Sequence, residues 1–432
     1  MDLKKFNKKR IFIGDIFNKK HKHVEIAGWV NNTRDLSKVK FLLLRDNSGL
    51  IQVTGIKGKT SESIFKDMEK IPRESVVYIK GIVKDSKQAP GGKEINPDEI
   101  ITLNLSEELP IDVSDFSKTE LPKRLDYRFL DLHRKKIQAI FKIQSEIANS
   151  FREFFYNKGF IEVFLPSIIS SSSEGGTELF NVKYFEKNAY LAQSPQLYKQ
   201  MVATSPLEKV FTITPVWRGE KHNTIRHLNE SRQMDIEIAF VGQEECMKYL
   251  EETIKYIVKE VIEKCKEELK TLDVNLKIPK MKYLSYEETV KLLKINYGDD
   301  FSPEDEKKLD KLFSDTLVFV HSWPADIKPF YIMPKNQEEN AKLSEGFDAI
   351  YRGVEISSGG QRIHLPELLK KKLKNKGLNL KNFKNYIDSF KFGAPKHSGW
   401  SIGLERLTML ICNLPNIREA CLFPRDRDRL SP

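Results

Sequence analysis

The sequence has few cysteines, and none of them is spaced like a zinc ligand. The 432 residues contain only four, and no two form a CxxC pair: Cys246, Cys265, Cys412 and Cys421. This pattern excludes a zinc ribbon and offers no disulfide scaffold. We therefore expect all four thiols to pack as small apolar groups in a reducing compartment.

Long apolar segments are also lacking. The first residues lead into lysines, and no later stretch approaches the roughly 20 apolar residues that span a bilayer. This favours a cytoplasmic protein. The chain is strongly charged instead, with 72 Lys and Arg, 61 Asp and Glu, and a formal net charge of +11. That excess favours an anionic partner, foremost nucleic acid, although lysine runs such as 370–372 are equally typical of a solvated face.

A complete phosphate-binding loop is the third absence. The turn at 55–60 ends in Gly-Lys-Thr, but Val53 occupies the position of the first glycine of a P-loop. Two arginines offer another way to hold a nucleotide, Arg218 and Arg406. Since each guanidinium can grip phosphate oxygens through two hydrogen bonds, we expect both to bind one triphosphate.

The chain is long enough for two domains. Residues 1–105 are predicted to form five short strands, at 24–30, 41–45, 51–54, 76–83 and 100–105. A five-stranded barrel of this length resembles an OB-fold, a common platform for single-stranded nucleic acid. On it, Phe41 and Gln52 are candidates to stack on and hydrogen-bond an unpaired base, and Glu94 to read a second base edge, although an aromatic side chain on a strand is more often core.

Residues 106–133 are polar and contain two prolines, and we predict a linker there. In the segment 134–432, strands and helices do not alternate regularly, which favours an antiparallel α+β domain. The apolar pattern predicts helices at 137–151, 244–269 and near the end, and strands at 160–163, 189–193, 210–217, 235–241, 330–333 and 353–356. Residues 272–324 are a possible inserted helical module, to which we assign no chemistry.

Three groups of side chains suggest a substrate site. Glu174, beside paired glycines, offers a carboxylate to an ammonium group, although an ordinary turn explains the same composition. Hard oxygen ligands of the kind that magnesium takes follow at Asp348, Glu355 and Ser358, and Arg362 just beyond them is a candidate clamp for a carboxylate. A surface hairpin with scattered acids is the alternative.

His222 and His227 are metal ligands by type only. They have no matching cysteine or third histidine, so substrate contacts or plain packing are favoured.

Taken in order, these motifs resemble those of the class II aminoacyl-tRNA synthetases, and most closely the aspartyl-tRNA synthetases of archaeal and eukaryotic type. The likeness covers nearly the whole chain. Residues 160–163 with Pro166 look like motif 1, residues 217–230 like motif 2, and residues 403–406 like motif 3. The resemblance implies an OB-fold domain that binds the anticodon, a class II antiparallel sheet flanked by helices, and a homodimer formed through the motif 1 region.

The resemblance also implies the substrates, namely L-aspartate, ATP with Mg²⁺, and tRNA(Asp). The ligand sets that it implies are for aspartate Glu174, Gln196, Lys199, Arg218, Ser358 and Arg362; for ATP Arg218, Gly219, Glu220, Arg226, His227, Leu228, Glu355, Gly403, Leu404, Glu405 and Arg406; and for the metal Asp348, Glu355 and Ser358. Arg218, Arg406 and Glu355 would carry the catalysis through positioning and charge neutralisation, without a protein nucleophile. The family usually has alanine at Gly219, a small change with little expected effect.

The amino acid and the tRNA are separate questions of specificity. Tyr198-Lys199 favours aspartate, because asparaginyl relatives usually have leucine at the lysine position. Family members that accept only tRNA(Asp) often carry tryptophan and lysine where this chain has Asn31 and Pro90. We therefore expect relaxed charging of tRNA(Asp) and tRNA(Asn), with an amidotransferase converting the second product.

Four alternatives stay open. They are a strictly discriminating aspartyl enzyme, an asparaginyl-tRNA synthetase, a tRNA-independent amidating paralogue and a noncatalytic RNA-binding protein. Lys199 and the ending 425–427 argue against the asparaginyl and the amidating alternatives, and retention of Arg218, Glu355 and Arg406 argues against the noncatalytic one.

Overall fold

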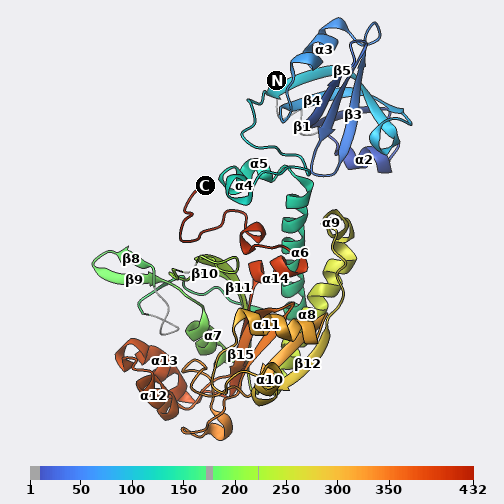
Figure 1. The fold of residues 1–432 in the computed structure, drawn as a ribbon. Helices are drawn as coiled ribbons and strands as arrows, with labels where there is room; N and C mark the ends of the chain where they lie inside the picture. Colours follow the sequence, from blue (N-terminus) through green and yellow to red (C-terminus); the bar gives the residue numbers. More distant parts are fainter. Residues whose placement is uncertain (1–9, 172–178, 222) are drawn as a thin grey trace. The chain divides into compact units, whose positions relative to one another are not determined.

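The computed structural model describes residues 10–171, 179–221 and 223–432. The chain divides into two compact units, one up to Pro110 and the other from Ile111 onward. Figure 1 shows the strands of the first unit and the mixed helices and strands of the second. Within the described residues, no helix is long and apolar enough to cross a membrane.

The first unit is a closed five-stranded barrel, in the order β1-β2-β3-β5-β4, with β4 paired back onto β1. Its elements are α2 (Ile13–Asn18), β1 (His23–Asp35), β2 (Val39–Arg45), β3 (Leu50–Ile56), α3 (Glu62–Asp67), η1 (Met68–Lys70), β4 (Val76–Asp85), η2 (Pro90–Gly92) and β5 (Lys93–Asn104). Leu42 and Leu44 of β2 are buried, whereas their neighbours Phe41 and Leu43 are only half-buried. This period of two is what a strand with one core face requires. The predicted OB-fold barrel is confirmed.

The second unit contains an eight-stranded mixed sheet, in the order β12-β13-β14-β15-β16-β11-β10-β6. Only the pairs β12–β13 and β10–β6 are parallel. The strands of this sheet are β6 (Ile161–Glu162), β10 (Lys209–Trp217), β11 (Glu230–Ala239), β12 (Lys280–Ser285), β13 (Thr316–His321), β14 (Gly346–Tyr351), β15 (Val354–Gln361) and β16 (His397–Gly403). The largely antiparallel α+β domain expected from the sequence is confirmed.

A smaller sheet, ordered β7-β9-β8, and several helices complete this unit. They are β7 (Ile168–Ile169), β8 (Asn181–Tyr184), β9 (Lys187–Leu191), α4 (Leu121–Asp126), α5 (Arg128–Asp131), α6 (Lys135–Asn157), α7 (Gln196–Ala203), α8 (Gln243–Lys264), α9 (Lys266–Thr271), α10 (Tyr286–Leu293), α11 (Pro303–Leu312), η3 (Lys335–Gln337), α12 (Pro366–Asn375), η4 (Leu380–Phe383), α13 (Lys384–Ser389), η5 (Phe390–Phe392), α14 (Leu404–Ile411) and η6 (Ile417–Ala420). The segment 106–133 thus contains two short helices in addition to extended chain.

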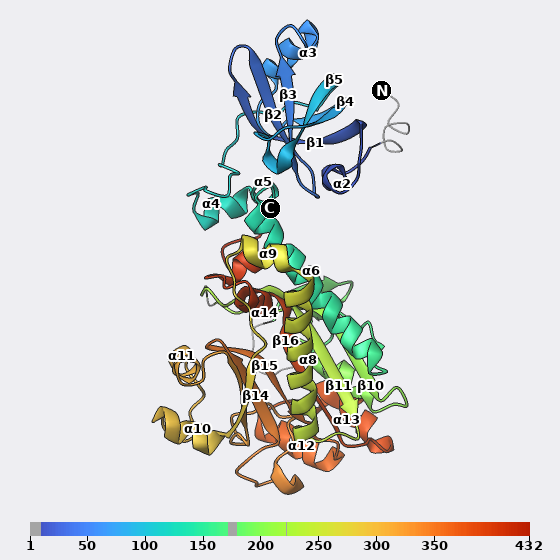
Figure 2. The ribbon, with the colours of Figure 1, turned by 90° about the vertical axis from the view of Figure 1, so that its right-hand side faces the viewer.

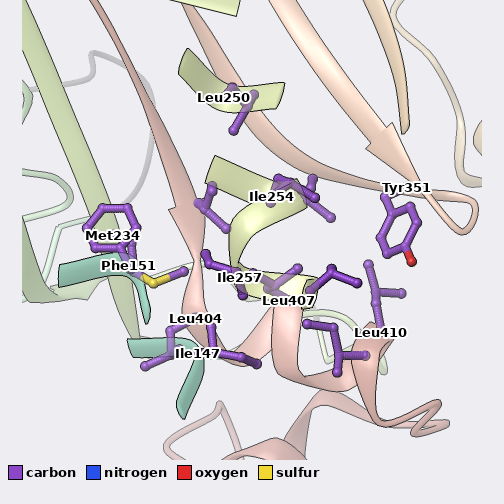
Figure 3. Close-up of a cluster of buried hydrophobic side chains, with 14 of the residues drawn as sticks. Ile147, Phe151, Met234, Leu250, Ile254, Ile257, Tyr351, Leu404, Leu407 and Leu410 are labelled. Carbon is purple, nitrogen blue, oxygen red and sulfur yellow. The ribbon is translucent and has the colours of Figure 1, made fainter. Parts of the chain in front are cut away.

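The main core lies between the large sheet and the long helices. Figure 2 shows α6 and α8 side by side along the sheet, and Figure 3 shows their side chains meeting it: Ile147 and Phe151 from α6, Leu250, Ile254 and Ile257 from α8, Met234 from β11, and Leu404, Leu407 and Leu410 from α14. On β11 and β16 the even-numbered residues Met234, Ile236, Trp400 and Ile402 join this core. Their odd-numbered neighbours must therefore face the other side of the sheet.

One predicted strand is wrong. Residues 330–333 make only an isolated bridge, between Ile332 and Arg362. These four apolar side chains instead fill a separate core with α12 and α13. A short apolar run is compatible with either kind of burial, so its periodicity could not decide.

Candidate active site

The open face of the large sheet carries a polar cavity of about 330 Å³. Its floor contains the odd-numbered side chains of β11, among them Gln233 and Asp235, together with Ser401 of β16. Most of the residues proposed from the sequence line it: Gln196, Arg218, Glu220, Arg226, His227, Leu228, Glu355, Ser358, Arg362, Gly403, Glu405 and Arg406. The fold therefore brings segments nearly 200 residues apart to one hollow.

Other proposed residues lie elsewhere. Lys199 and Asp348 are buried next to the cavity without lining it, and Gly219 and Leu404 flank residues that do line it. Glu174 and His222 lie outside the described residues.

The two arginines of the expected nucleotide site both reach the cavity. Arg218 directly follows β10, and its backbone is held by Asn229, whose Nδ2 donates to the Arg218 carbonyl at 2.7 Å. Arg406 lies in the first turn of α14, and its Nη1 donates to the Glu355 carbonyl at 2.7 Å. The Arg218 backbone and the Arg406 guanidinium are thus held in place, which suits the binding of a flexible triphosphate.

A chain of four buried charges lies beside the cavity. Lys199 Nζ lies 2.6 Å from Asp235 Oδ1 and 3.6 Å from Glu237 Oε2. Glu237 in turn accepts hydrogen bonds from Arg362, at 2.9 Å from Nε and 3.3 Å from Nη2. Burial by itself lowers the pKa of Arg362, but Glu237 outweighs burial and raises it above the usual value. The Arg362 guanidinium is thereby held charged.

This pairing changes the argument for amino-acid selectivity. Bound asparagine would not leave the charges of Lys199 and Arg362 without a partner, because each already pairs with an acidic side chain of the protein. Lysine and arginine carry only N–H donors and no acceptor. Lys199 and Arg362 can therefore offer a ligand only further N–H groups in fixed orientations. A carboxylate accepts from such donors, whereas the amide nitrogen of asparagine cannot.

The proposed metal ligands come from two neighbouring strands. Asp348 of β14 pairs in register with Ser358 of β15, and Glu355 lies on the same strand as Ser358. Asp348 Oδ2 accepts from Lys328 Nζ, while its Oδ1 is buried without a hydrogen-bond partner. Burial, and next the Asp348 carboxylate, raises the pKa of Glu355. Charge repulsion and an orphaned oxygen are what a cation would relieve, so these residues fit magnesium.

Among the residues that the structure describes, no group of three or more His, Cys, Asp or Glu side chains forms a metal site. The magnesium assignment accordingly depends on a hydroxyl as well as two carboxylates. All four cysteines have free thiols, three of them buried. Burial raises the pKa of each, which suits the structural part expected from the sequence.

The C-terminal segment holds the loop between β10 and β11. Arg418 donates to Asn223 Oδ1, to the Thr224 carbonyl and to Asp426. The backbone amide of Asn229 donates to the Arg425 carbonyl at 2.8 Å. The loop that supplies Arg226 and His227 to the cavity is therefore fixed by residues far downstream.

The barrel has a separate surface hollow of about 460 Å³, lined among others by Phe41, Gln52, Glu94 and Pro90. Gln52 Nε2 donates to Glu94 Oε2 at 3.0 Å. The three residues proposed to read bases therefore converge. Asn31 does not line this hollow: its Oδ1 accepts from Arg45 Nη1 at 2.8 Å, and the neighbouring Asn32 lines the hollow instead.

Sequence reasoning missed several acidic residues in and around the cavity. Asp235 and Glu237 were placed only in a strand, although a pair of carboxylates two residues apart shares one face of a strand and could have been noticed. Glu306 of α11 reaches Arg226 from the segment to which no chemistry was assigned. Nothing local in its sequence marks it.

Two family profiles match the chain. Residues 120–427 match the family described as tRNA synthetases class II (D, K and N), and residues 24–103 match the OB-fold nucleic acid binding domain. The solved structure of asparaginyl-tRNA synthetase from Pyrococcus horikoshii, complexed with asparaginyl-adenylate, superposes with a TM-score of 0.93 at 32% identity, covering 98% of this chain and 99% of that one.

Curated relatives are more similar in sequence. The chain is 46% identical over 424 residues to the aspartate–tRNA(Asp) ligase of Pyrococcus furiosus, covering 95% of this chain and 96% of that protein. It is 44% identical over 417 residues to the aspartate–tRNA(Asp/Asn) ligase of Methanothermobacter thermautotrophicus, covering 95% of each. Similarity of this extent shows the enzyme family and leaves the choice of tRNA open. The chain belongs to the class II tRNA synthetases (D, K and N), and within them to the archaeal-type aspartyl-tRNA synthetases.

Proposed function

We propose that this aspartate–tRNA ligase makes aspartyl-adenylate in the cavity of the second unit and then charges both tRNA(Asp) and tRNA(Asn). The observation that supports the first step is the convergence of Arg218, Arg406 and Arg362 on one hollow. A carboxylate oxygen of aspartate attacks the α-phosphorus of ATP, and the bond to pyrophosphate breaks. A terminal ribose hydroxyl of the tRNA then attacks the aspartyl carbonyl carbon, and AMP leaves.

The residues around the cavity divide between the two substrates. Arg218 bridges the α-carboxylate of aspartate and the α-phosphate of ATP, and Arg406 holds the γ-phosphate. Glu220 and residues 226–228 bind the rest of ATP, with Gly219 and residues 403–405 shaping its site. Positioned charges that meet the developing negative charge on phosphate oxygens supply the catalysis.

For the amino acid, Arg362 and Lys199 present donors to the side-chain carboxylate, and Gln196, Ser358 and Glu174 hold the rest. A site that presents N–H donors to two carboxylate oxygens rejects asparagine, because its amide nitrogen cannot accept a hydrogen bond from the second donor.

Asp348, Glu355 and Ser358 would hold Mg²⁺. When bound there, the ion neutralises charge on the phosphate oxygens of ATP. The unpartnered Asp348 Oδ1 is the observation that favours this assignment.

The relaxed choice of tRNA rests on the barrel. Pro90 lines the hollow with Phe41, Gln52 and Glu94, so a proline borders the proposed base-reading surface at the position where discriminating relatives often carry lysine. Asn31 would act through Arg45 and the adjacent strand rather than by direct contact. A partner amidotransferase would then convert aspartyl-tRNA(Asn).

Aminoacylation of separate tRNA(Asp) and tRNA(Asn) transcripts with labelled aspartate tests this proposal, with labelled asparagine as the control. Charging of both transcripts by aspartate supports it. Charging of tRNA(Asp) alone would refute the relaxed choice and keep the adenylate chemistry.

We further propose a homodimer formed around β6 and β7. Four large apolar side chains are exposed at intervals between the end of α6 and β7: Tyr156, Ile161, Phe164 and Ile168. Phe164 is 87% exposed. Exposed apolar patches of this kind mark interaction surfaces. Sedimentation of the wild type and of Phe164→Ser should show a dimer and a weakened dimer, and a monomeric wild type would exclude the assembly.

A further inference from the structure

Helix α11 brings an acidic side chain to the back of the ATP end of the cavity. Ser302 is the N-cap residue of this helix. Its hydroxyl accepts a hydrogen bond from the Asp305 backbone amide, and the Asp305 carboxylate accepts one from the Ser302 backbone amide. This reciprocal capping fixes the first turn. Helix α11, labelled in Figure 1, contacts β15, and its first turn carries Glu306.

Glu306 lies behind the cavity wall and contacts two residues of that wall, Arg226 and Glu355. Its Oε2 accepts from Arg226 Nη1 at 2.8 Å, and its Oε1 accepts from the Glu355 amide at 3.2 Å. Arg226 and Glu355 line the cavity, whereas Glu306 is not among the lining residues. One carboxylate thus joins the loop after β10 to the start of β15.

The guanidinium of Arg226 is fixed at a second point. Its Nη2 donates to the Gly353 carbonyl at 3.1 Å. The Arg226 and Glu306 side chains are only 17% and 13% exposed, so the bond between them is shielded from water. Arginine has five N–H donors, so two bonds that set its orientation leave others for a ligand.

We propose that Glu306 is a positioning residue for ATP: it orders the Arg226 guanidinium, before the substrate arrives, in the orientation that meets the triphosphate. A free arginine side chain loses rotamer entropy when it binds a ligand, whereas a side chain that is already ordered does not. The inference rests on the proposed contact between Arg226 and ATP. It gives helix α11 a part in nucleotide binding, although the segment 272–324 is not the helical module that the sequence suggested, because it also contains β12 and β13 of the large sheet.

Pyrophosphate exchange tests this inference by separating the two substrates. Glu306→Ala should raise the KM for ATP by about tenfold, the scale of one lost hydrogen bond to a charged group, and leave the KM for aspartate unchanged. Glu306→Gln keeps an acceptor and should fall between the wild type and the alanine variant. Glu304→Ala is the matched control, because Glu304 lies in the same helical turn and is exposed.

A double variant shows whether Glu306 acts through Arg226. If it does, Glu306→Ala should add nothing to the effect of Arg226→Ala. Failure of Arg226→Ala to raise the KM for ATP would reject the proposed contact of Arg226 with ATP. A normal KM for ATP in Glu306→Ala, beside a raised one in Arg226→Ala, would reject the positioning inference alone. A lowered KM in Glu306→Ala would mean that the carboxylate competes with the triphosphate, which also overturns it.

If Glu306→Ala only disturbed the fold, it would change quantities other than the KM for ATP. It would lower the melting temperature and raise the KM for aspartate as well. Should Glu306→Ala fail to fold, the same comparison is made with Glu306→Gln, whose KM for ATP alone must rise.

Discussion

Replacement of Lys199 by methionine should destabilise the second unit more than any surface change. The methionine keeps most of the aliphatic length but removes the ammonium that lies 2.6 Å from Asp235 and 3.2 Å from the Trp400 carbonyl. Lys199 and Asp235 side chains are each 2% exposed, so water cannot replace the lost partner. Breaking one partner of a buried pair costs about 3 to 5 kcal/mol.

Urea unfolding followed by tryptophan fluorescence measures this loss, since Trp323 and Trp400 are both buried in this unit. The double variant Lys199→Met with Asp235→Asn should recover part of the stability, because it removes the carboxylate left without its cation. A single-variant loss below about 1 kcal/mol, the size seen for exposed pairs, would refute the reasoning. So would a double variant whose loss equals or exceeds the sum of the two single losses.

Three further predictions concern other parts of the molecule. Burial lowers the pKa of His397 to about 4, below its usual 6.5, so between these two pH values the unfolded chain binds a proton that the folded chain does not. The free energy of unfolding should therefore fall by about 3 kcal/mol as the pH drops through this window. Urea unfolding should show this loss in the wild type and a smaller loss in His397→Phe. Arg406→Ala should abolish pyrophosphate exchange, while tRNA binding measured by filter retention persists. Retained exchange would contradict the proposed binding of the γ-phosphate by Arg406. Phe41→Ala should weaken tRNA binding by about 1 to 3 kcal/mol, the value of one stacked base, without changing pyrophosphate exchange.

The sequence predicted the barrel well because its strands obey a local rule. Alternation of buried and exposed residues is visible within a few positions, and β2 and β4 lie where the pattern placed them. Much of the cavity was also predictable from the motifs, since twelve of the proposed residues line it. Their spacing along the chain is typical of the family even where they are far apart.

The rest depended on contacts that have no local signature. Lys199 and Asp235 are 36 residues apart, and only the packing of α7 on β11 joins them. Glu306 meets Arg226 across 80 residues. The wrong strand at 330–333 has the same cause: an apolar run shows that it is buried but not against what.

The bonds between Arg418 and the loop after β10 also bear on the order in which the ribosome makes the chain. Asn223 and Arg418 are separated by 195 residues. At the usual 5 to 20 residues per second, the loop therefore waits about 10 to 40 s for its anchor. During translation, a nascent chain can already hold a finished barrel while the loop after β10, a part of the proposed ATP site, is still unfixed. Nucleotide binding should therefore be among the last properties that a newly made copy acquires.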